Sequence, residues 1–128
     1  MRVLLDTNAL LWALVEPRRL SRAARMLLED VETEIFTSSV SAYEIARKHQ
    51  IGKLSTAAAV VQGYGNHLRE LGAREIELTG IHAVTAARLL TPHRDPFDRL
   101  LAAQSLIEDI PVVTPDQAIA DFGAATIW

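Results

Sequence analysis

Four carboxylates at widely separated positions share one local context in this sequence. They are Asp6, Glu44, Asp98 and Asp116. Each lies at or within the first turn of a predicted helix, where a single carboxylate can simply cap backbone N–H groups or offset the helix dipole. If all four meet in one crevice they repel one another, at roughly 3 kcal/mol per pair for charges about 5 Å apart and an effective dielectric of about 20. No cationic partner is evident for them in the sequence, so the pattern predicts a bound cation.

The ligand types indicate which cation this is. Hard carboxylate oxygens, with neither histidine nor cysteine among the four, favour Mg²⁺ or Mn²⁺ over Zn²⁺. Mg²⁺ held in this way keeps several waters, can make one of them a hydroxide-like nucleophile, and can neutralise charge on a reacting phosphodiester. The four carboxylates therefore predict metal-dependent phosphodiester hydrolysis, which is the chemistry of a nuclease.

Three of these carboxylates follow strands that the apolar runs predict. The predicted strands cover residues 2–5, 35–37 and 112–114. In an open parallel sheet the carboxyl ends of the strands open onto one crevice, in which ligands bind. We therefore expect Asp6, Glu44 and Asp116 to converge. Asp98 follows a helix and a loop, so its spacing alone does not place it with the others.

Helices are predicted between the strands from apolar spacing and from start and stop residues. Their expected ranges are 9–15, about eight residues after Ser21, 41–50, 56–71, 81–90, 97–109 and a short helix from Pro115-Asp116. Ser41 and Glu44 form a capping box. Further strands are predicted at 74–78 and, at a sheet edge, at 126–127. Short apolar strands alternating with helices predict an α/β fold, with a mostly parallel sheet of four to five strands covered on both faces.

Length and composition predict one domain, residues 1–128, with 49% hydrophobic residues. The absence of cysteine excludes disulfides and thiol chemistry and is typical of a reducing compartment, so we expect a cytoplasmic protein. Asp6 interrupts the apolar N-terminal stretch, which therefore does not resemble a signal peptide, and no apolar run approaches the roughly 20 residues of a membrane span. The net charge of −3 argues against a protein that coats nucleic acid through its overall field.

Four motifs carry a resemblance to a known family. They are DTN at 6–8, SSVSAYEIARKHQIGKL at 38–54, HRDPFDRLLAAQS at 93–105 and TPD at 114–116. In this order and over the full length, they resemble the PIN domain, and in particular the VapC-type toxins, which are ribonucleases of type II toxin–antitoxin systems. The resemblance implies a PIN-like three-layer α/β/α fold and a metal-dependent endoribonuclease that acts on RNA, with a cognate antitoxin protein as partner.

The resemblance also implies roles for single residues. By this likeness Asp6, Glu44 and Asp98 are the primary metal ligands, and Asp116 is an outer or second-metal ligand. Two neighbouring residues would orient the ligands by hydrogen bonding, namely Asn8 and Thr114.

Basic residues near the acidic positions have two interpretations. Arg47, Lys48, Arg94 and Arg99 could hold RNA phosphates on either side of the cut, or they could be solvated helix charges. His93 could contact RNA or donate a proton, although a loop cap is the more common role, and Asp95 is interpreted as a helix cap.

The wholly apolar helix 9–15 favours a homodimer and a partner segment docked on apolar surface near Leu10, Leu11 and Trp12. Trp12 itself is most simply a core residue, of which an exposed part would suit a partner's helix. The cognate antitoxin is expected to inhibit the enzyme by presenting an arginine or lysine to the four carboxylates.

Other functions fit the sequence less well. A phosphoacceptor receiver domain would need paired acids after the first strand and a lysine after the last, but one Asp follows the first strand and no lysine lies beyond Lys53. A hydrolase with an aspartyl nucleophile would need a second aspartate two residues after Asp6, where Asn8 stands. A catalytically silent binding module would not need all four carboxylates. A PIN-fold DNA nuclease is the nearest alternative, but this short chain has no room for large DNA-gripping insertions.

Overall fold

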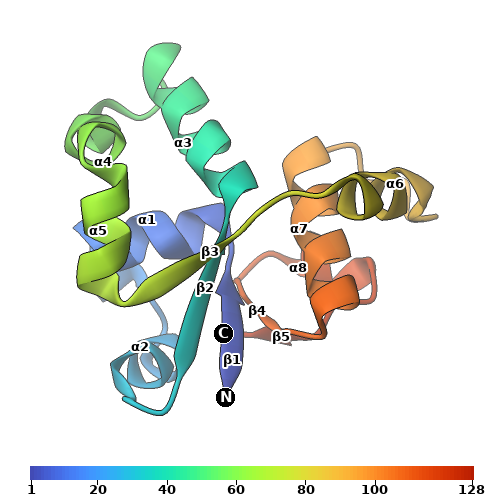
Figure 1. Cartoon of the computed structure of the whole chain (residues 1–128), viewed down its shortest axis with the longest axis horizontal. Coiled ribbons are helices and arrows are strands. Elements are labelled where there is room, and N and C mark those ends of the chain that lie inside the picture. The colour runs from blue at the N-terminus through green and yellow to red at the C-terminus, as the bar shows by residue number, and fades with distance from the viewer.

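A five-stranded parallel sheet forms the centre of the molecule. The computed structural model describes the backbone of residues 1–128 and every side chain except that of Thr56. The strands are β1 (Arg2–Leu5), β2 (Glu34–Ser38), β3 (Ala73–Ile76), β4 (Val112–Val113) and β5 (Thr126–Ile127). Their order is β3-β2-β1-β4-β5, and all four pairings are parallel (Figure 1). The predicted α/β class is confirmed, and β5 is the edge strand that the sequence indicates.

The central strand β1 is buried on both faces, which explains why its sequence is a continuous apolar run and not an alternating one. Leu4 pairs with Phe36 of β2 and with Val112 of β4. Val3 and Leu5 point into one hydrophobic cluster, whereas Leu4 points into the other. The next residue after this strand is Asp6, so the fold places a carboxylate at the carboxyl edge of the innermost strand.

Helices from the first part of the chain cover one face of the sheet (Figure 1). They are α1 (Thr7–Val15), α2 (Arg22–Glu29), α4 (Ala58–Gln62) and α5 (Tyr64–Leu71), with short 3₁₀ turns at Pro17–Arg19 and Ser55–Ala57. The helix α3 (Ser39–Gln50) packs with them through Ile45. Leu10, Val60 and Leu68 belong to the same cluster as Val3 and Leu5 of β1.

Helices from the second part of the chain cover the other face (Figure 1). They are α6 (Gly80–Arg88), α7 (Pro96–Glu108) and α8 (Gln117–Asp121). Leu101 of α7 and Ile119 of α8 pack against Leu4 and Val112 of the sheet. The expected three-layer arrangement is therefore confirmed. In the described part of the chain, no helix has the length and apolar character needed to cross a membrane.

Several helix boundaries differ from the sequence-based expectation. The helix α3 begins two residues earlier than predicted, because Ser38 and not Ser41 accepts the capping hydrogen bond, here from Val40 N at 3.0 Å. Ser41 is instead buried inside the helix, and its Oγ lies 3.0 Å from Thr7 Oγ1. The predicted capping box of Ser41 and Glu44 is therefore wrong, and Glu44 lies in the second turn of α3.

The long helix predicted at 56–71 is divided at Gly63 into α4 and α5, and it ends as expected at Gly72, which has a positive φ of 75°.

The expectation of an exposed apolar surface on helix α1 is wrong in part. Leu10 is fully buried and Leu11 is 6% exposed, since both pack in the core beneath the sheet. Trp12 is half-buried, with its ring 5.7 Å from that of Trp128 and the Arg19 guanidinium 4.8 Å from its centre. A partner can therefore reach Trp12 and the exposed Val15, but not the two leucines.

Candidate active site

Asp6 is held rigidly at the junction of β1 and α1. Its Oδ1 accepts a hydrogen bond from Ala9 N at 2.7 Å, which makes Asp6 the N-cap of α1. Its Oδ2 accepts a hydrogen bond from Thr114 Oγ1 at 2.5 Å. The residue is 5% exposed. A carboxylate that caps a helix and also receives a side-chain hydroxyl has little freedom to rotate, so its orientation is fixed before any ligand arrives.

Thr114 connects Asp6 to Asp116 at the end of the neighbouring strand β4. Its Oγ1 donates to Asp6 and accepts a hydrogen bond from Asp116 N at 2.9 Å. Asp116 is exposed and caps α8 by accepting from Ala118 N at 2.9 Å. Asn8, to which the resemblance gives a similar supporting role, is exposed, and its side chain makes no hydrogen bond to the described residues.

Asp98 reaches the site from the first turn of α7. The loop before α7 folds back so that His93 Nε2 lies 2.9 Å from Asp98 Oδ2. Asp95 caps the helix, as expected, and its Oδ1 accepts hydrogen bonds from Phe97 N at 2.9 Å and Asp98 N at 3.4 Å. The loop therefore supplies both the cap that starts α7 and the imidazole that contacts Asp98.

Burial and neighbouring negative charge raise the pKa of two of the four carboxylates, Asp6 and Asp98. Burial raises the pKa of Asp6 from 3.8 to about 6; the hydrogen bonds from Thr114 and Ala9 oppose this rise, and the negative charges of Asp98 and Asp116 add to it. Burial likewise raises the pKa of Asp98 to about 6, opposed by the hydrogen bond with His93 and reinforced by Asp95 and Asp116. The charges of Asp98 and Asp116 therefore both reach Asp6, and Asp98 joins it although its spacing in the sequence did not place it there, whereas Glu44 is not among the charges that act on either residue.

Glu44 is carried by α3 and has a charged partner of its own. The hydrogen bond between Thr7 and Ser41 fixes α3 next to the start of α1, and Glu44 follows Ser41 by three residues, on the same side of the helix. The Glu44 side chain is 8% exposed, and its Oε2 lies 2.5 Å from Lys48 Nζ. The expectation that the carboxylates lack a built-in cationic partner is therefore wrong for Glu44.

Arg99 has a structural role that the sequence did not reveal. Its guanidinium uses four of its five N–H groups to donate to the carbonyl oxygens of Ala86, Leu89, Thr91 and His93, at 2.5–3.0 Å. It also lies 5.3 Å from the ring centre of Phe122. The interpretation of Arg99 as an RNA contact does not fit this geometry, because the side chain is already committed to holding the loop that carries His93.

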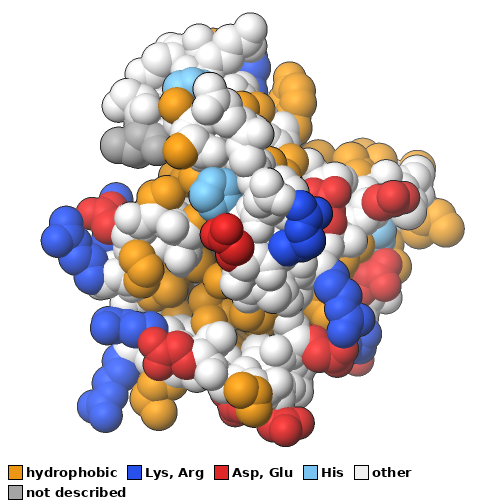
Figure 2. All heavy atoms as spheres, turned by 60° about the vertical axis from the view of Figure 1, so that its left-hand side comes forward, with side chains coloured by type: hydrophobic (Ala, Val, Ile, Leu, Met, Phe, Trp, Pro, Cys, Tyr) orange, Lys and Arg blue, Asp and Glu red, His pale blue; other side chains and the backbone are white. Residues whose placement is uncertain are grey.

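The other basic residues remain at the surface. Arg94 and Arg47 are exposed, and Arg47 Nη1 donates to Gln50 Oε1 at 3.3 Å. Figure 2 shows acidic and basic side chains interspersed over the face that carries α4 and α5, without an extended basic surface. This face therefore offers a polyanion no continuous basic surface, in agreement with the net charge of −3.

The donor set fits a hard divalent cation. Asp6 and Asp98 offer carboxylate oxygens in a poorly solvated place, where neighbouring negative charge makes a cation favourable, and oxygen ligands are those that Mg²⁺ and Mn²⁺ prefer. Among the described residues, one group of three offers ligand atoms within 4.8 Å of one another, and it consists of His93, Asp95 and Asp98. Asp95, interpreted from the sequence as no more than a cap, therefore lies at the border of the candidate site.

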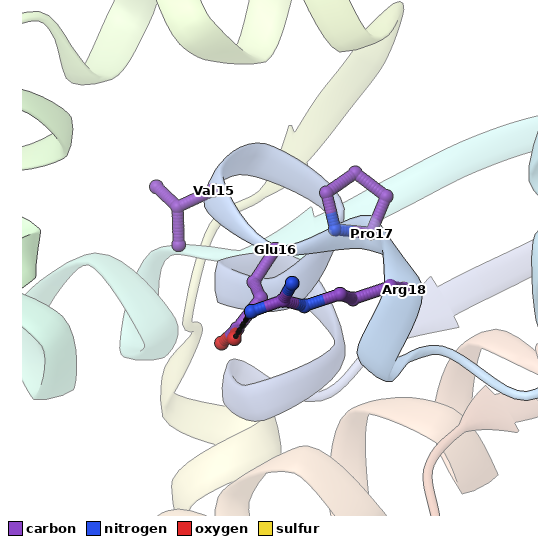
Figure 3. A pocket seen from close by; sticks show the side chains of 4 residues that line it. All are labelled: Val15, Glu16, Pro17 and Arg18. Atoms are coloured by element: carbon purple, nitrogen blue, oxygen red, sulfur yellow. Dashed lines mark hydrogen bonds and ion pairs between the residues drawn. The ribbon is translucent and has the colours of Figure 1, made fainter.

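The open hollow at the other end of α1 is a different feature. It has a volume of about 550 Å³ and is lined by Val15, Glu16, Pro17 and Arg18 (Figure 3). Arg18 pairs with Glu16 at 3.2 Å. The length of α1, about 14 Å for nine residues, separates it from Asp6. It contributes nothing to the carboxylate site.

Comparisons with known proteins agree with this fold. Residues 3–125 match the family model of the PIN domain, and the chain belongs to the PIN domain family. Ribonuclease VapC22 from Mycobacterium tuberculosis is 31% identical to it over 133 aligned positions, which cover 98% of both chains.

Solved structures share the fold at lower identity. A chain in the structure of VapBC2 from Rickettsia felis bound to a promoter DNA fragment superposes with a TM-score of 0.69 at 15% identity, covering 99% of this chain and 98% of that one. A chain of FitAcB from Neisseria gonorrhoeae superposes with a TM-score of 0.66 at 19% identity, covering 98% and 96%.

Proposed function

We propose that this protein is a metal-dependent endoribonuclease and the toxin of a toxin–antitoxin pair. The observation that carries the proposal is the placement of Asp6 at the carboxyl end of β1, where the negative charges of Asp98 and Asp116 both add to the rise of its pKa. The 31% identity to a ribonuclease over nearly the whole chain supports RNA as the substrate. Residues 1–128 act as one PIN domain in this proposal.

Asp6, Glu44 and Asp98 would hold Mg²⁺ or Mn²⁺, with Asp116 as an outer ligand. The bound cation supplies an activated water and neutralises charge on the phosphodiester. The protein's own part is to orient the ligands in advance. Thr114 and the start of α1 hold Asp6, and His93 holds Asp98, so that little side-chain freedom remains to be lost.

The protonation of these acids sets the pH range of the site. Because the pKa values of Asp6 and Asp98 lie at about 6, both groups become ionised as the pH rises through that value. Cation binding requires the ionised form and therefore weakens in acid. The affinity for the cation should accordingly begin to fall at a higher pH than for ordinary carboxylates.

RNA would be held by local contacts beside the carboxylates. Arg47 and Arg94 are exposed, and Lys48 is partly exposed, so all three can reach phosphates on either side of the cut. Phosphate contacts position the strand without reading its bases, which fits a site with few groups for base recognition.

An antitoxin partner is part of the proposal, because similar chains occur in the VapBC2 and FitAcB structures. A lysine or arginine of such a partner would neutralise the negative charge of the carboxylates in place of the divalent cation. We expect its apolar anchor to contact Trp12 and Val15, which remain accessible at the end of α1.

Cleavage assays on matched substrates test the proposal. The protein should cut single-stranded RNA in the presence of Mn²⁺ or Mg²⁺, and Asp98→Asn should remove the activity. A DNA strand of the same sequence distinguishes the alternative, because preferential cutting of the DNA would indicate a PIN-fold DNA nuclease. Phosphorylation of the protein by acetyl phosphate, without cleavage of either strand, would favour a receiver-like signalling domain.

A further inference from the structure

In the ion pair of Glu44 and Lys48, the carboxylate is buried and the lysine side chain is partly exposed to solvent. Glu44 is 8% exposed and is carried by α3, which the Thr7–Ser41 hydrogen bond fixes against α1. The Lys48 side chain is 38% exposed and ends in an ammonium on a flexible stem of four carbons. When the pair separates, the lysine can therefore move into solvent, whereas the carboxylate stays in place.

The start of α3, which carries Glu44, also contacts the helices that hold Asp6 and Asp98. Tyr43, next to Glu44, packs its ring 6.1 Å from that of Phe97, the residue before Asp98. The start of α3 thus contacts α1 near Asp6 and α7 near Asp98. A buried negative charge needs a counter-ion, and Lys48 makes the one ion pair found for Glu44 among the described residues.

We propose that Lys48 is a positioning residue that competes with the divalent cation for Glu44. In the metal-free protein its ammonium stabilises the ionised, buried carboxylate. When Glu44 becomes a metal ligand, the two cations repel each other, and Lys48 leaves Glu44 and turns to the adjacent solvent, where the phosphates of RNA would lie. The inference rests on the proposed function, since it requires a metal site that includes Glu44.

A purely structural role for Lys48 makes a different prediction. Pairs of Glu and Lys four residues apart commonly stabilise a helix by a few tenths of a kcal/mol. Loss of such a pair would lower the stability of α3 slightly and leave the affinity for a metal unchanged. Metal affinity therefore separates the two interpretations, and it can be measured without any RNA.

The test is a titration of the metal-free protein with Mn²⁺, followed by the electron paramagnetic resonance of free Mn²⁺. We expect Lys48→Met to bind Mn²⁺ about fivefold more tightly than the unmodified protein, the size expected for loss of a partly exposed competing ion pair. Lys48→Arg keeps the charge and should stay close to the unmodified protein. Lys53→Met is the matched control, because Lys53 is exposed on the same part of the chain, and its affinity should not change.

A double-mutant cycle shows whether the effect passes through Glu44. In the Glu44→Gln background the additional change Lys48→Met should alter the Mn²⁺ affinity by less than twofold, because the shared partner is absent. Equal effects in both backgrounds would mean that Lys48 acts only as a nearby charge and would overturn the proposal, as would an unchanged or weaker affinity of Lys48→Met. Absence of Mn²⁺ binding to the unmodified protein would instead overturn the proposed metal site itself.

Discussion

Replacement of Asp6 by asparagine should make the metal-free protein more stable while it removes activity. The pKa of Asp6 rises from 3.8 to about 6 on folding, mainly because burial disfavours the charge. At pH 7.5 the ionised group therefore costs about 3 kcal/mol of folding free energy. Asparagine carries no charge and escapes this cost.

The substitution also loses part of what Asp6 contributes. An asparagine oxygen can still accept from Ala9 N, so the cap of α1 is kept. The amide nitrogen then faces Thr114 Oγ1, which can no longer donate, at a cost of about 1 kcal/mol. The net gain is about 1 to 2 kcal/mol, which corresponds to a rise in Tm of about 4 to 8 °C for a chain of this length.

The pH dependence provides an internal check. Because the folded-state pKa is raised, the folded protein binds more protons than the unfolded chain between pH 3.8 and about 6. The contribution of Asp6 to stability is therefore most favourable in acid and is lost as the pH rises through about 6. The advantage of Asp6→Asn should be full at pH 7.5 and should shrink toward pH 4.5.

Thermal unfolding followed by circular dichroism in excess EDTA, at pH 4.5 and 7.5, measures both effects. Glu29→Gln is the control, since it removes one exposed charge away from the site and should change Tm little. A lower Tm for Asp6→Asn at pH 7.5 would refute the reasoning, because it would mean that Asp6 is present for its hydrogen bonds and not as a metal ligand.

Three further outcomes follow from the same contacts. Arg99→Met should lower the free energy of unfolding by about 2 to 4 kcal/mol in urea titrations, because four carbonyl oxygens lose their donor; a change below 0.5 kcal/mol, on the order of an ordinary surface substitution, would contradict that role. Thr114→Val should raise the pKa of Asp6 further, so that Mn²⁺ binding fails at a higher pH than in the unmodified protein; an unchanged pH dependence would show that Thr114 does not tune Asp6. Sedimentation at micromolar concentration should show about twice the monomer mass. A monomeric mass would contradict the expected homodimer, and Val15 and Trp12 would then be available only for contact with the antitoxin.

The central strands β1 and β4 could be predicted because each is a short apolar run in the sequence. The three-residue stretch Val3–Leu5 is buried on both faces and has the matching composition. The start of α3 could not be predicted in this way. Ser38, Ser39 and Ser41 are all good capping residues, and the choice between them depends on Thr7, which comes from a distant part of the chain.

Part of the candidate site could be predicted from the sequence, namely the part that depends on local features such as strand ends. The positions of Asp6 and Asp116 follow from strand ends, whereas that of Asp98 depends on how the loop before α7 folds back. The role of Arg99 depends on the same loop, so no local pattern reveals it. The pairing of Glu44 with Lys48 did have a signal, since a Glu four residues before a Lys on a helix is a favourable arrangement.

Metal-dependent RNA cleavage tests the central claim most directly. The unmodified protein and Asp98→Asn, purified in parallel, would each be incubated with a labelled single-stranded RNA, with Mn²⁺ and with excess EDTA. The carboxylate site predicts cleavage by the unmodified protein with Mn²⁺, none in EDTA, and none by Asp98→Asn in either condition. Cleavage that continues in EDTA, or that is equal in the two proteins, would contradict the claim that these carboxylates carry the reaction.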